Sequence, residues 1–263
     1  METSWSDGVL MRSCTAVVFC GGRATRLQSQ LSGRAKALVT LDRNPYLYGL
    51  LNQLHDAGLK EVILCVSPFT EDIIEDVRGG RAFGLEIRYS LDTGLHENAS
   101  ALWHCHARLR TPLALCINGD TIVDVDFRQL LRAHIRSGAA CTLVASDRMD
   151  QPHPGAVEVD AGGKVIDLHE WAQDRQVEVR AYRSSRFYTN SGVYVFNVAA
   201  LGSRCAPEDR TGKIEQGLLR SLAKSGGLFA FSNGSRYLLD LGTPHRLSTA
   251  RSQLSSISQF FTV

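Results

Sequence analysis

Short apolar runs alternate with amphipathic stretches along the first 145 residues, and no other feature of the sequence restricts the fold as strongly. The apolar runs have the length of buried strands, and the stretches between them carry apolar residues at helical spacing. Residues 45–57 are typical, because four leucines lie on one helical face and Gly58 follows where a helix would end. The expected strands are 15–19, 61–66, 86–89, 113–117 and 141–145, and the expected helices are 45–57, 70–77, 100–109 and 127–137.

This alternation indicates βαβ units and a parallel sheet. Beyond residue 155 the pattern changes: residues 156–168 predict a β-hairpin, 191–196 a further strand, and 214–224 and 244–253 helices. We therefore expect an α/β protein with one doubly wound, mostly parallel, Rossmann-like sheet and a small inserted β-rich portion in its second half. Ligands of such sheets bind beyond the carboxyl ends of the strands, so functional residues should follow the strands directly.

The charges nearly cancel, with 29 Lys and Arg against 27 Asp and Glu and a net charge of +2. A chain that is 44% hydrophobic and 21% charged is too apolar to be disordered. The near-neutral balance argues against a general nucleic-acid or membrane-surface binder, while a local basic site is compatible with it. We therefore expect neither nucleic acid nor a membrane among the partners.

The chain has seven cysteines, an odd number without a Cys-x-x-Cys pair, and several stand inside apolar runs, as Cys65 and Cys116 do. This is typical of buried free thiols in a reducing compartment rather than of a disulfide framework. The first residues are acidic and lack the apolar core of a signal peptide, and no apolar run approaches the roughly 18 residues of a membrane span. We expect a cytoplasmic protein.

A loop rich in glycine and arginine, residues 20–27, follows the first expected strand. Its adjacent glycines let backbone N–H groups approach an anion closely. Arg23, Arg26, Arg34 and Lys36 add four cations with no acid among them, a composition suited to a polyphosphate. The loop is neither a Walker A motif nor a Gly-x-Gly-x-x-Gly dinucleotide fingerprint. For this segment alone, the alternative interpretation is a solvated basic loop.

Residues 17–27 and 35–38 resemble the signature of the sugar-1-phosphate nucleotidyltransferases, which reads Gly-Gly-x-Gly-Thr-Arg-Leu and then Pro-Lys-Pro-Leu. Further segments stand in the family's order over roughly residues 14–250, and the ordered set is specific although each piece is short. Within the family, residues 118–126 look most like the guanylyltransferases that act on heptose 1-phosphates. The further segments are 83–89, 118–120, 190–196, Glu215 and 240–244.

The resemblance implies a GT-A-like nucleotidyltransferase fold and the transfer of a nucleoside monophosphate from an NTP, with GTP favoured, to a sugar 1-phosphate. The products would be an NDP-sugar and pyrophosphate, and the protein would be an enzyme that forms, as relatives do, a homo-oligomer. Two alternatives stay open. One is a cytidylyltransferase acting on a phosphocholine-like non-sugar phosphate or phosphonate, and the other is a catalytically silent paralogue that binds nucleotide-sugars and regulates a partner.

We expect a single nucleotidyltransferase domain over residues 14–255. Its nucleotide-binding part would span about 14–150, and its sugar-phosphate-binding part about 151–240. Residues 1–13 and 256–263 are expected to be terminal tails.

Transfer of this kind depends on positioning and charge neutralisation more than on a covalent nucleophile. By resemblance, Arg26 would contact the β- and γ-phosphates of the leaving group, and Lys36 would stabilise the charge that develops on the α-phosphate. Both are therefore expected to be catalytic. The residues expected to bind the nucleotide are Gly21, Gly22, Arg23, Ala24, Thr25, Asn98 and Gly119.

Asp120 and Asp240 resemble the family's pair that holds Mg²⁺ between the triphosphate and the sugar phosphate, and carboxylates suit this hard cation. Either one alone would more often be a loop or capping aspartate, but both match family motifs. Asp124 and Asp126 could instead form the Asp-x-Asp metal site of a nucleotide-sugar glycosyltransferase. Their position just before the helix expected at Phe127 favours a capping role.

On the sugar side, Trp171 stands where the family's Glu-Lys pair has its lysine. Arg180, Arg183 and Arg186 could supply the missing charge, or they could form a solvated basic loop. The residues expected to bind the acceptor are Glu170, Asn190, Gly192, Lys213 and Glu215.

Two further departures from the family concern the nucleotide. Residues 95–103 replace the family's Leu-Gly-Thr-x-Gly-Ala and are closer in spacing to cytidylyltransferases, so Asn98 is a candidate base contact without a chosen base. Ala24 and Ala35 replace a glycine and a proline. A methyl group at Ala24 would cost about 1 kcal/mol if the backbone there has a positive φ.

Overall fold

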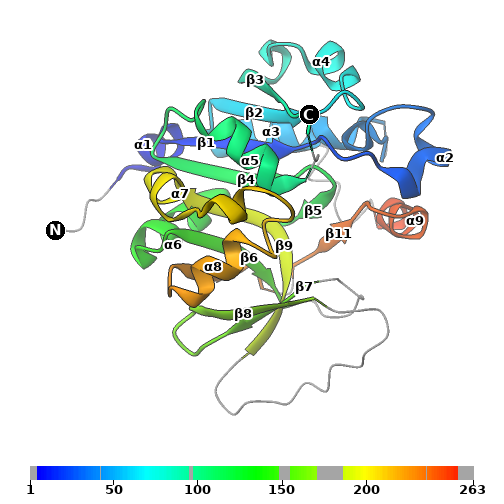
Figure 1. Cartoon of the computed structure of the whole chain (residues 1–263). Coiled ribbons are helices and arrows are strands. Elements are labelled where there is room, and N and C mark those ends of the chain that lie inside the picture. The colour runs from blue at the N-terminus through cyan, green and yellow to red at the C-terminus, as the bar shows by residue number, and fades with distance from the viewer. Residues whose placement is uncertain are drawn as a thin grey trace.

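The protein, seen in a computed structural model, has a mostly parallel central sheet with helices on both faces (Figure 1). The structure describes residues 5–41, 43–94, 97–147, 155–170, 186–234 and 236–253. The main strands are β1 (Cys14–Phe19), β2 (Glu61–Val66), β3 (Glu86–Leu91), β4 (Leu113–Asn118), β6 (Cys141–Ser146), β9 (Arg186–Asn197) and β10 (Leu228–Ser232). They lie in the order β10-β6-β9-β4-β1-β2-β3, and β9 alone runs antiparallel to its neighbours β4 and β6 within these described strands.

Both faces of the central strands are buried, because side chains alternate between two hydrophobic cores. Ala16 and Val18 of β1 pack into the first core, and Val17 packs into the second. Helices of the first core are α1 (Asp7–Arg12), α2 (Gln28–Leu31), α3 (Tyr46–Ala57), α4 (Asp72–Val77), α6 (Phe127–Ser137) and α9 (Pro244–Ser252). Helices of the second core are α5 (Asn98–His106), α7 (Val198–Arg204) and α8 (Leu218–Lys224).

Two smaller β structures lie beside the central sheet. β7 (Gly155–Val159) and β8 (Val165–Glu170) form the predicted hairpin, and β7 also pairs with residues 186–189 of β9, so the hairpin extends the sheet at the bottom of Figure 1. β5 (Thr121–Val123) and β11 (Leu238–Asp240) form a separate antiparallel ribbon, with α9 following directly.

The doubly wound, mostly parallel α/β fold expected from the sequence is confirmed. β2 and α6 have the expected bounds. Asp126 caps α6, because its carboxylate accepts the backbone N–H groups of Arg128 at 2.9 Å and Gln129 at 3.1 Å. The capping interpretation of this aspartate is therefore confirmed. Gly58, with a φ of 101°, ends α3 as expected.

The expected N-terminal tail needs a correction, because residues 1–13 include helix α1. Its Leu10 and Met11 are buried in the first core, and its Asp7 pairs with Arg132 of α6 at 2.5 Å. A helix of six residues is too short to show an apolar period in the sequence. Residues 256–263, the expected C-terminal tail, lie outside the described residues.

All seven cysteines are among the described residues, and each is buried and free. Burial raises the pKa of the Cys14 thiol to about 12, and it raises the pKa of Cys141 well above its ordinary value. In the part of the chain that the structure describes, no helix is both long enough and apolar enough to cross a membrane.

Candidate active site

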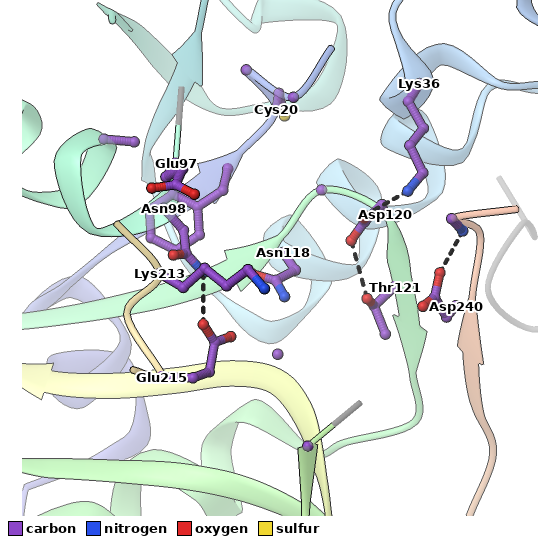
Figure 2. Close-up of a pocket in the computed structure, with 18 of the residues that line it drawn as sticks. Cys20, Lys36, Glu97, Asn98, Asn118, Asp120, Thr121, Lys213, Glu215 and Asp240 are labelled. Atoms are coloured by element: carbon purple, nitrogen blue, oxygen red, sulfur yellow. Dashed lines mark hydrogen bonds and ion pairs between the residues drawn. The ribbon is translucent and has the colours of Figure 1, made fainter. Parts of the chain in front are cut away.

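A cavity of about 550 Å³ opens beyond the carboxyl ends of β1, β2 and β4 (Figure 2). Its walls come from the loop after β1, from the β5–β11 ribbon, from the start of α5, from β9 and from the segment that precedes α8. The predicted site residues that line it are Gly21, Gly22, Arg23, Ala24, Thr25, Arg26, Lys36, Asn98, Gly119, Asp120, Asn190, Gly192, Lys213, Glu215 and Asp240.

The structure describes only some of the residues that the sequence predicts to bind the acceptor. The side chain of Glu170 lies outside the described residues, as do Trp171, Arg180 and Arg183. Arg186 begins β9 in an exposed position and does not line the cavity. The replacement of the family's lysine by an arginine of this stretch therefore stays a prediction.

The loop after β1 is strained at Ala24, where the sequence analysis considered a positive φ. Ala24 has a φ of 49° and a ψ of 35°, which is the left-handed conformation that favours glycine. The methyl group at this position therefore costs about 1 kcal/mol. Next to it, the guanidinium group of Arg23 lies 4.4 Å from the centroid of the Phe69 ring, a cation–π contact that restrains the arginine at the cavity wall.

The four cations of the loop do not all face the cavity. Arg23, Arg26 and Lys36 line it, whereas Arg34 pairs with Asp76 of α4 at 3.1 Å. Of the four cations that the sequence suggested for a polyphosphate, three therefore line the cavity and Arg34 does not. The acids that take up Arg34 stand some 40 residues later in the chain, so inspection of the loop alone could not reveal them.

Lys36 and Asp120, which both line the cavity, form a close ion pair. The lysine Nζ lies 2.6 Å from Asp120 Oδ2, and the hydroxyl of Thr121 donates to the other carboxylate oxygen at 3.2 Å. Gly119 brings Asp120 to this place, because its backbone runs so close to β1 that a Cβ there would lie 2.6 Å from the carbonyl oxygen of Phe19. A larger residue at Gly119 would push the carboxylate away from the lysine.

Asp240 reaches the same end of the cavity through the β5–β11 ribbon. It stands opposite Thr121 in the ribbon, and the next backbone N–H, that of Leu241, donates to the carbonyl oxygen of Asp120 at 2.8 Å. One carboxylate oxygen of Asp240 pairs with Arg246 of α9 at 2.5 Å, and the other accepts the N–H of Gly242. The ribbon thus brings two carboxylates together that are far apart in the sequence (Figure 2).

These two carboxylates fit a magnesium ion that is shared with a bound phosphate. Mg²⁺ is commonly held by one or two protein carboxylates while phosphate oxygens and water complete its shell. Among the residues that the structure describes, no group of three or more His, Cys, Asp or Glu side chains has the spacing of a metal site.

On the opposite wall, three polar side chains form a chain of hydrogen bonds. The Tyr194 hydroxyl donates to Glu215 Oε1 at 2.8 Å and accepts from the Asn190 amide at 3.0 Å. Burial, followed by the charge of Glu215, raises the pKa of Tyr194 well above its ordinary value, so the phenol remains protonated. Lys213 and Asn118 also line the cavity, and both are labelled in Figure 2.

Asn98 takes part in the same wall, although the sequence suggested a contact with the base. Its amide oxygen accepts the N–H of Ile214 at 2.8 Å, and its amide nitrogen lies 3.4 Å from Glu215 Oε2. Both ends of the amide thus face the segment before α8. These partners stand more than 100 residues later in the chain, beyond the reach of local sequence reasoning.

Tyr194, Asn118 and Glu97 are lining or supporting residues that the sequence analysis did not name. For Tyr194 a signal was present, because residues 190, 192 and 194 of one strand share a face. Gly192 has a φ of 69°, and a Cβ there would lie 2.5 Å from the amide nitrogen of Asn118. This glycine is required for the close approach of β9 to the end of β4.

A doubly wound α/β sheet with a charged cavity at the carboxyl ends of its strands defines the class of α/β proteins that bind small ligands at that edge. The family model described as "Nucleotidyl transferase" matches residues 15–256 of this chain. The chain therefore belongs to the nucleotidyl transferase family, which confirms the resemblance seen in the motifs.

Similar proteins with known names agree with this family. The chain is 26% identical to the D-glycero-alpha-D-manno-heptose 1-phosphate guanylyltransferase of Aneurinibacillus thermoaerophilus, over 91% of this chain and 97% of that protein. It is 27% identical to the mannose-1-phosphate guanylyltransferase of Mycobacterium tuberculosis, over 87% of this chain but only 61% of that protein. The crystal structure of HddC from Yersinia pseudotuberculosis complexed with GMP-PN matches with a TM-score of 0.73 at 21% identity, covering 92% and 99% of the two chains, and so shares the fold.

Proposed function

We propose that this protein transfers GMP from GTP to the phosphate of a sugar 1-phosphate and releases pyrophosphate. One observation carries the proposal: a single cavity joins the Arg26–Lys36 cations and the two carboxylates at one end to the Asn190–Glu215 wall at the other. The first end suits a magnesium triphosphate, and the second end offers hydrogen-bonding groups for sugar hydroxyls.

The reaction is a single displacement. An oxygen of the sugar phosphate attacks the α-phosphorus of GTP, the bond between the α-phosphorus and the bridging oxygen breaks, and pyrophosphate leaves with the electron pair. Lys36 would neutralise charge at the α-phosphate, and Arg26 would neutralise charge on the leaving group. The attacking phosphate is already anionic near pH 7, so the step requires no general base from the protein.

Asp120 and Asp240 would hold the magnesium ion. When bound, the ion supplies charge neutralisation between the triphosphate and the acceptor phosphate. Lys36 and Arg246 now pair with these carboxylates, and the two cations balance the two anions. Lys36 lines the cavity and would turn toward a phosphate once its carboxylate has another cation as partner.

Support for guanine comes from two sources. The relatives of A. thermoaerophilus and M. tuberculosis are named as guanylyltransferases. In addition, the half-buried Glu97 lines the cavity at the start of α5. Guanine carries two adjacent N–H donors on one edge, and a carboxylate is the side chain that accepts both.

Pyrophosphate release tests the proposal. The protein is incubated with Mg²⁺, with each of GTP, CTP, UTP, dTTP and ATP, and with heptose, mannose or glucose 1-phosphate or phosphocholine as acceptor. We expect release with GTP and a sugar 1-phosphate, and none when the acceptor is omitted.

Two other outcomes would replace the proposal. Release only with CTP and phosphocholine would assign the protein to the cytidylyltransferases. Absence of release with every pair, together with binding of a nucleotide-sugar in a calorimetric titration, would identify a silent binder.

A further inference from the structure

Both carboxylate oxygens of Glu215 are held by protein donors. Oε1 accepts the Tyr194 hydroxyl at 2.8 Å, and Oε2 lies 3.4 Å from the amide nitrogen of Asn98. Tyr194 comes from β9 in the centre of the sheet, and Asn98 is the first residue of α5. A strand of the central sheet and the start of a helix therefore meet at one side chain.

The backbone that carries Glu215 is a turn, residues 214–217, which precedes α8 and is also hydrogen-bonded to the start of α5. The Ile214 N–H donates to the side-chain oxygen of Asn98 at 2.8 Å, and the Ala99 N–H donates to the carbonyl oxygen of Gly212 at 3.2 Å. An unrestrained glutamate loses side-chain conformational entropy when a ligand fixes it. The existing hydrogen bonds remove much of that freedom before a ligand arrives.

Tyr194 is suited to the role of a fixed donor. Its side chain is fully buried, with 0% exposure, and its hydroxyl also accepts the Asn190 amide at 3.0 Å. Because burial raises its pKa well above the ordinary value, the phenol keeps its proton throughout the neutral range. The carboxylate of Glu215, which lines the cavity, has further lone pairs that can accept donors of a bound ligand.

We propose that Tyr194 and Asn98 are positioning residues, which hold Glu215 and Asn190 in the orientation that binds the hydroxyl groups of the acceptor sugar. The inference rests on the proposed nucleotidyl transfer and adds two residues to its acceptor site. It also removes Asn98 from the nucleotide side, because the amide is engaged by the acceptor wall.

Tyr194→Phe tests the first contact, since it removes one hydroxyl and keeps the buried ring. With GTP and mannose 1-phosphate as probes, we expect the KM for mannose 1-phosphate to rise about tenfold while the KM for GTP and kcat change less than about twofold. Tyr188→Phe is the matched control, because it makes the same substitution on the same strand outside the cavity lining, and we expect unchanged constants. A Tyr194→Phe protein that melts like the wild type and has an unchanged KM for mannose 1-phosphate would overturn the inference.

Asn98→Asp tests the second contact independently of the tyrosine. The aspartate keeps an acceptor for the Ile214 N–H but replaces the donor to Glu215 with a second negative charge. We expect the KM for mannose 1-phosphate to rise about tenfold or more, with the KM for GTP little changed. A rise in the KM for GTP alone would assign Asn98 to the base and contradict its role as a positioning residue of the acceptor site.

The failure of the proposed function has a different signature. A wild-type protein that is inactive with every acceptor would overturn the proposed function, and with it the acceptor role of Glu215.

Discussion

Single charged residues at one end of the cavity form pairs that are open to water. The side chain of Asp120 is 41% exposed, although its partner Lys36 is only 14% exposed. An ion pair with this much solvent contact contributes about 0–1 kcal/mol to stability. The value of these residues therefore lies in the ligand that they would bind rather than in the fold.

Lys36→Ala and Asp120→Asn should abolish most turnover without unfolding the protein. We expect kcat to fall at least about 100-fold, since each variant removes a charge placed at the reacting phosphates. Pyrophosphate release measures the loss, and a thermal melt measures the fold. Asp124→Asn is a suitable control, because Asp124 pairs with Arg236 at 3.5 Å and does not line the cavity. A collapsed melting transition for either Lys36→Ala or Asp120→Asn would show that the pair is structural.

At the scale of elements, the site depends on how closely neighbouring strand ends approach one another. Gly119 follows β4 beside the end of β1, and a Cβ there would lie 2.6 Å from a backbone oxygen. Gly22 is the third residue after the end of β1, and a Cβ there would meet nothing within 4 Å. Two glycines near the same sheet edge therefore have different roles.

Gly119→Ala should destabilise the protein by about 1–3 kcal/mol, because the methyl group forces β1 and β4 apart. Gly22→Ala should change stability by less than about 0.5 kcal/mol. Urea unfolding of both variants gives the comparison. Equal midpoints for the two would contradict the geometry described for Gly119.

The contact between α6 and β6 predicts a pH dependence. His134 of α6 is buried against Thr142 of β6 at 2.9 Å, and burial lowers its pKa from 6.5 to about 4. Below pH 6.5 the imidazole of His134 becomes protonated in the unfolded chain, but in the folded chain it stays neutral until the pH falls to about 4. Stability is therefore lost as the pH falls through this window, by about 3 kcal/mol in total.

His134→Gln should weaken this dependence. Urea unfolding between pH 7 and pH 4.5 is expected to give a shallower loss of stability for the variant than for the wild type. Parallel curves for the two proteins would mean that His134 does not titrate differently in the folded state.

Sequence reasoning succeeded where a local pattern determines the element. β2 and α6 were predictable because an apolar run, a capping aspartate and a terminal glycine are all local signals. The pairing of β5 with β11 was not predictable, since each strand has three residues and the partner is distant in sequence. The hydrogen-bond partners of the Asn98 amide were not predictable either, because Ile214 and Glu215 come close to it only in the tertiary fold.

For the whole molecule, the cysteines lie on both sides of the sheet and all are buried. Burial raises the pKa of thiols such as Cys14, to about 12, so the reactive thiolate is scarce at neutral pH. We expect an aromatic disulfide reagent at pH 8 to label the native protein slowly and to label all seven thiols rapidly in denaturant. Rapid labelling of the native protein would show an opening that the structure does not contain.

The β5–β11 ribbon also has a consequence for synthesis on the ribosome. Asp120 leaves the ribosome well before Asp240, which belongs to a strand that follows the described strands of the central sheet in the chain. A nascent chain that has folded β1–β4 already has its arginine loop but lacks the second carboxylate. The two carboxylates meet only when β11 pairs with β5, so the proposed metal site is completed after the described strands of the central sheet have been made.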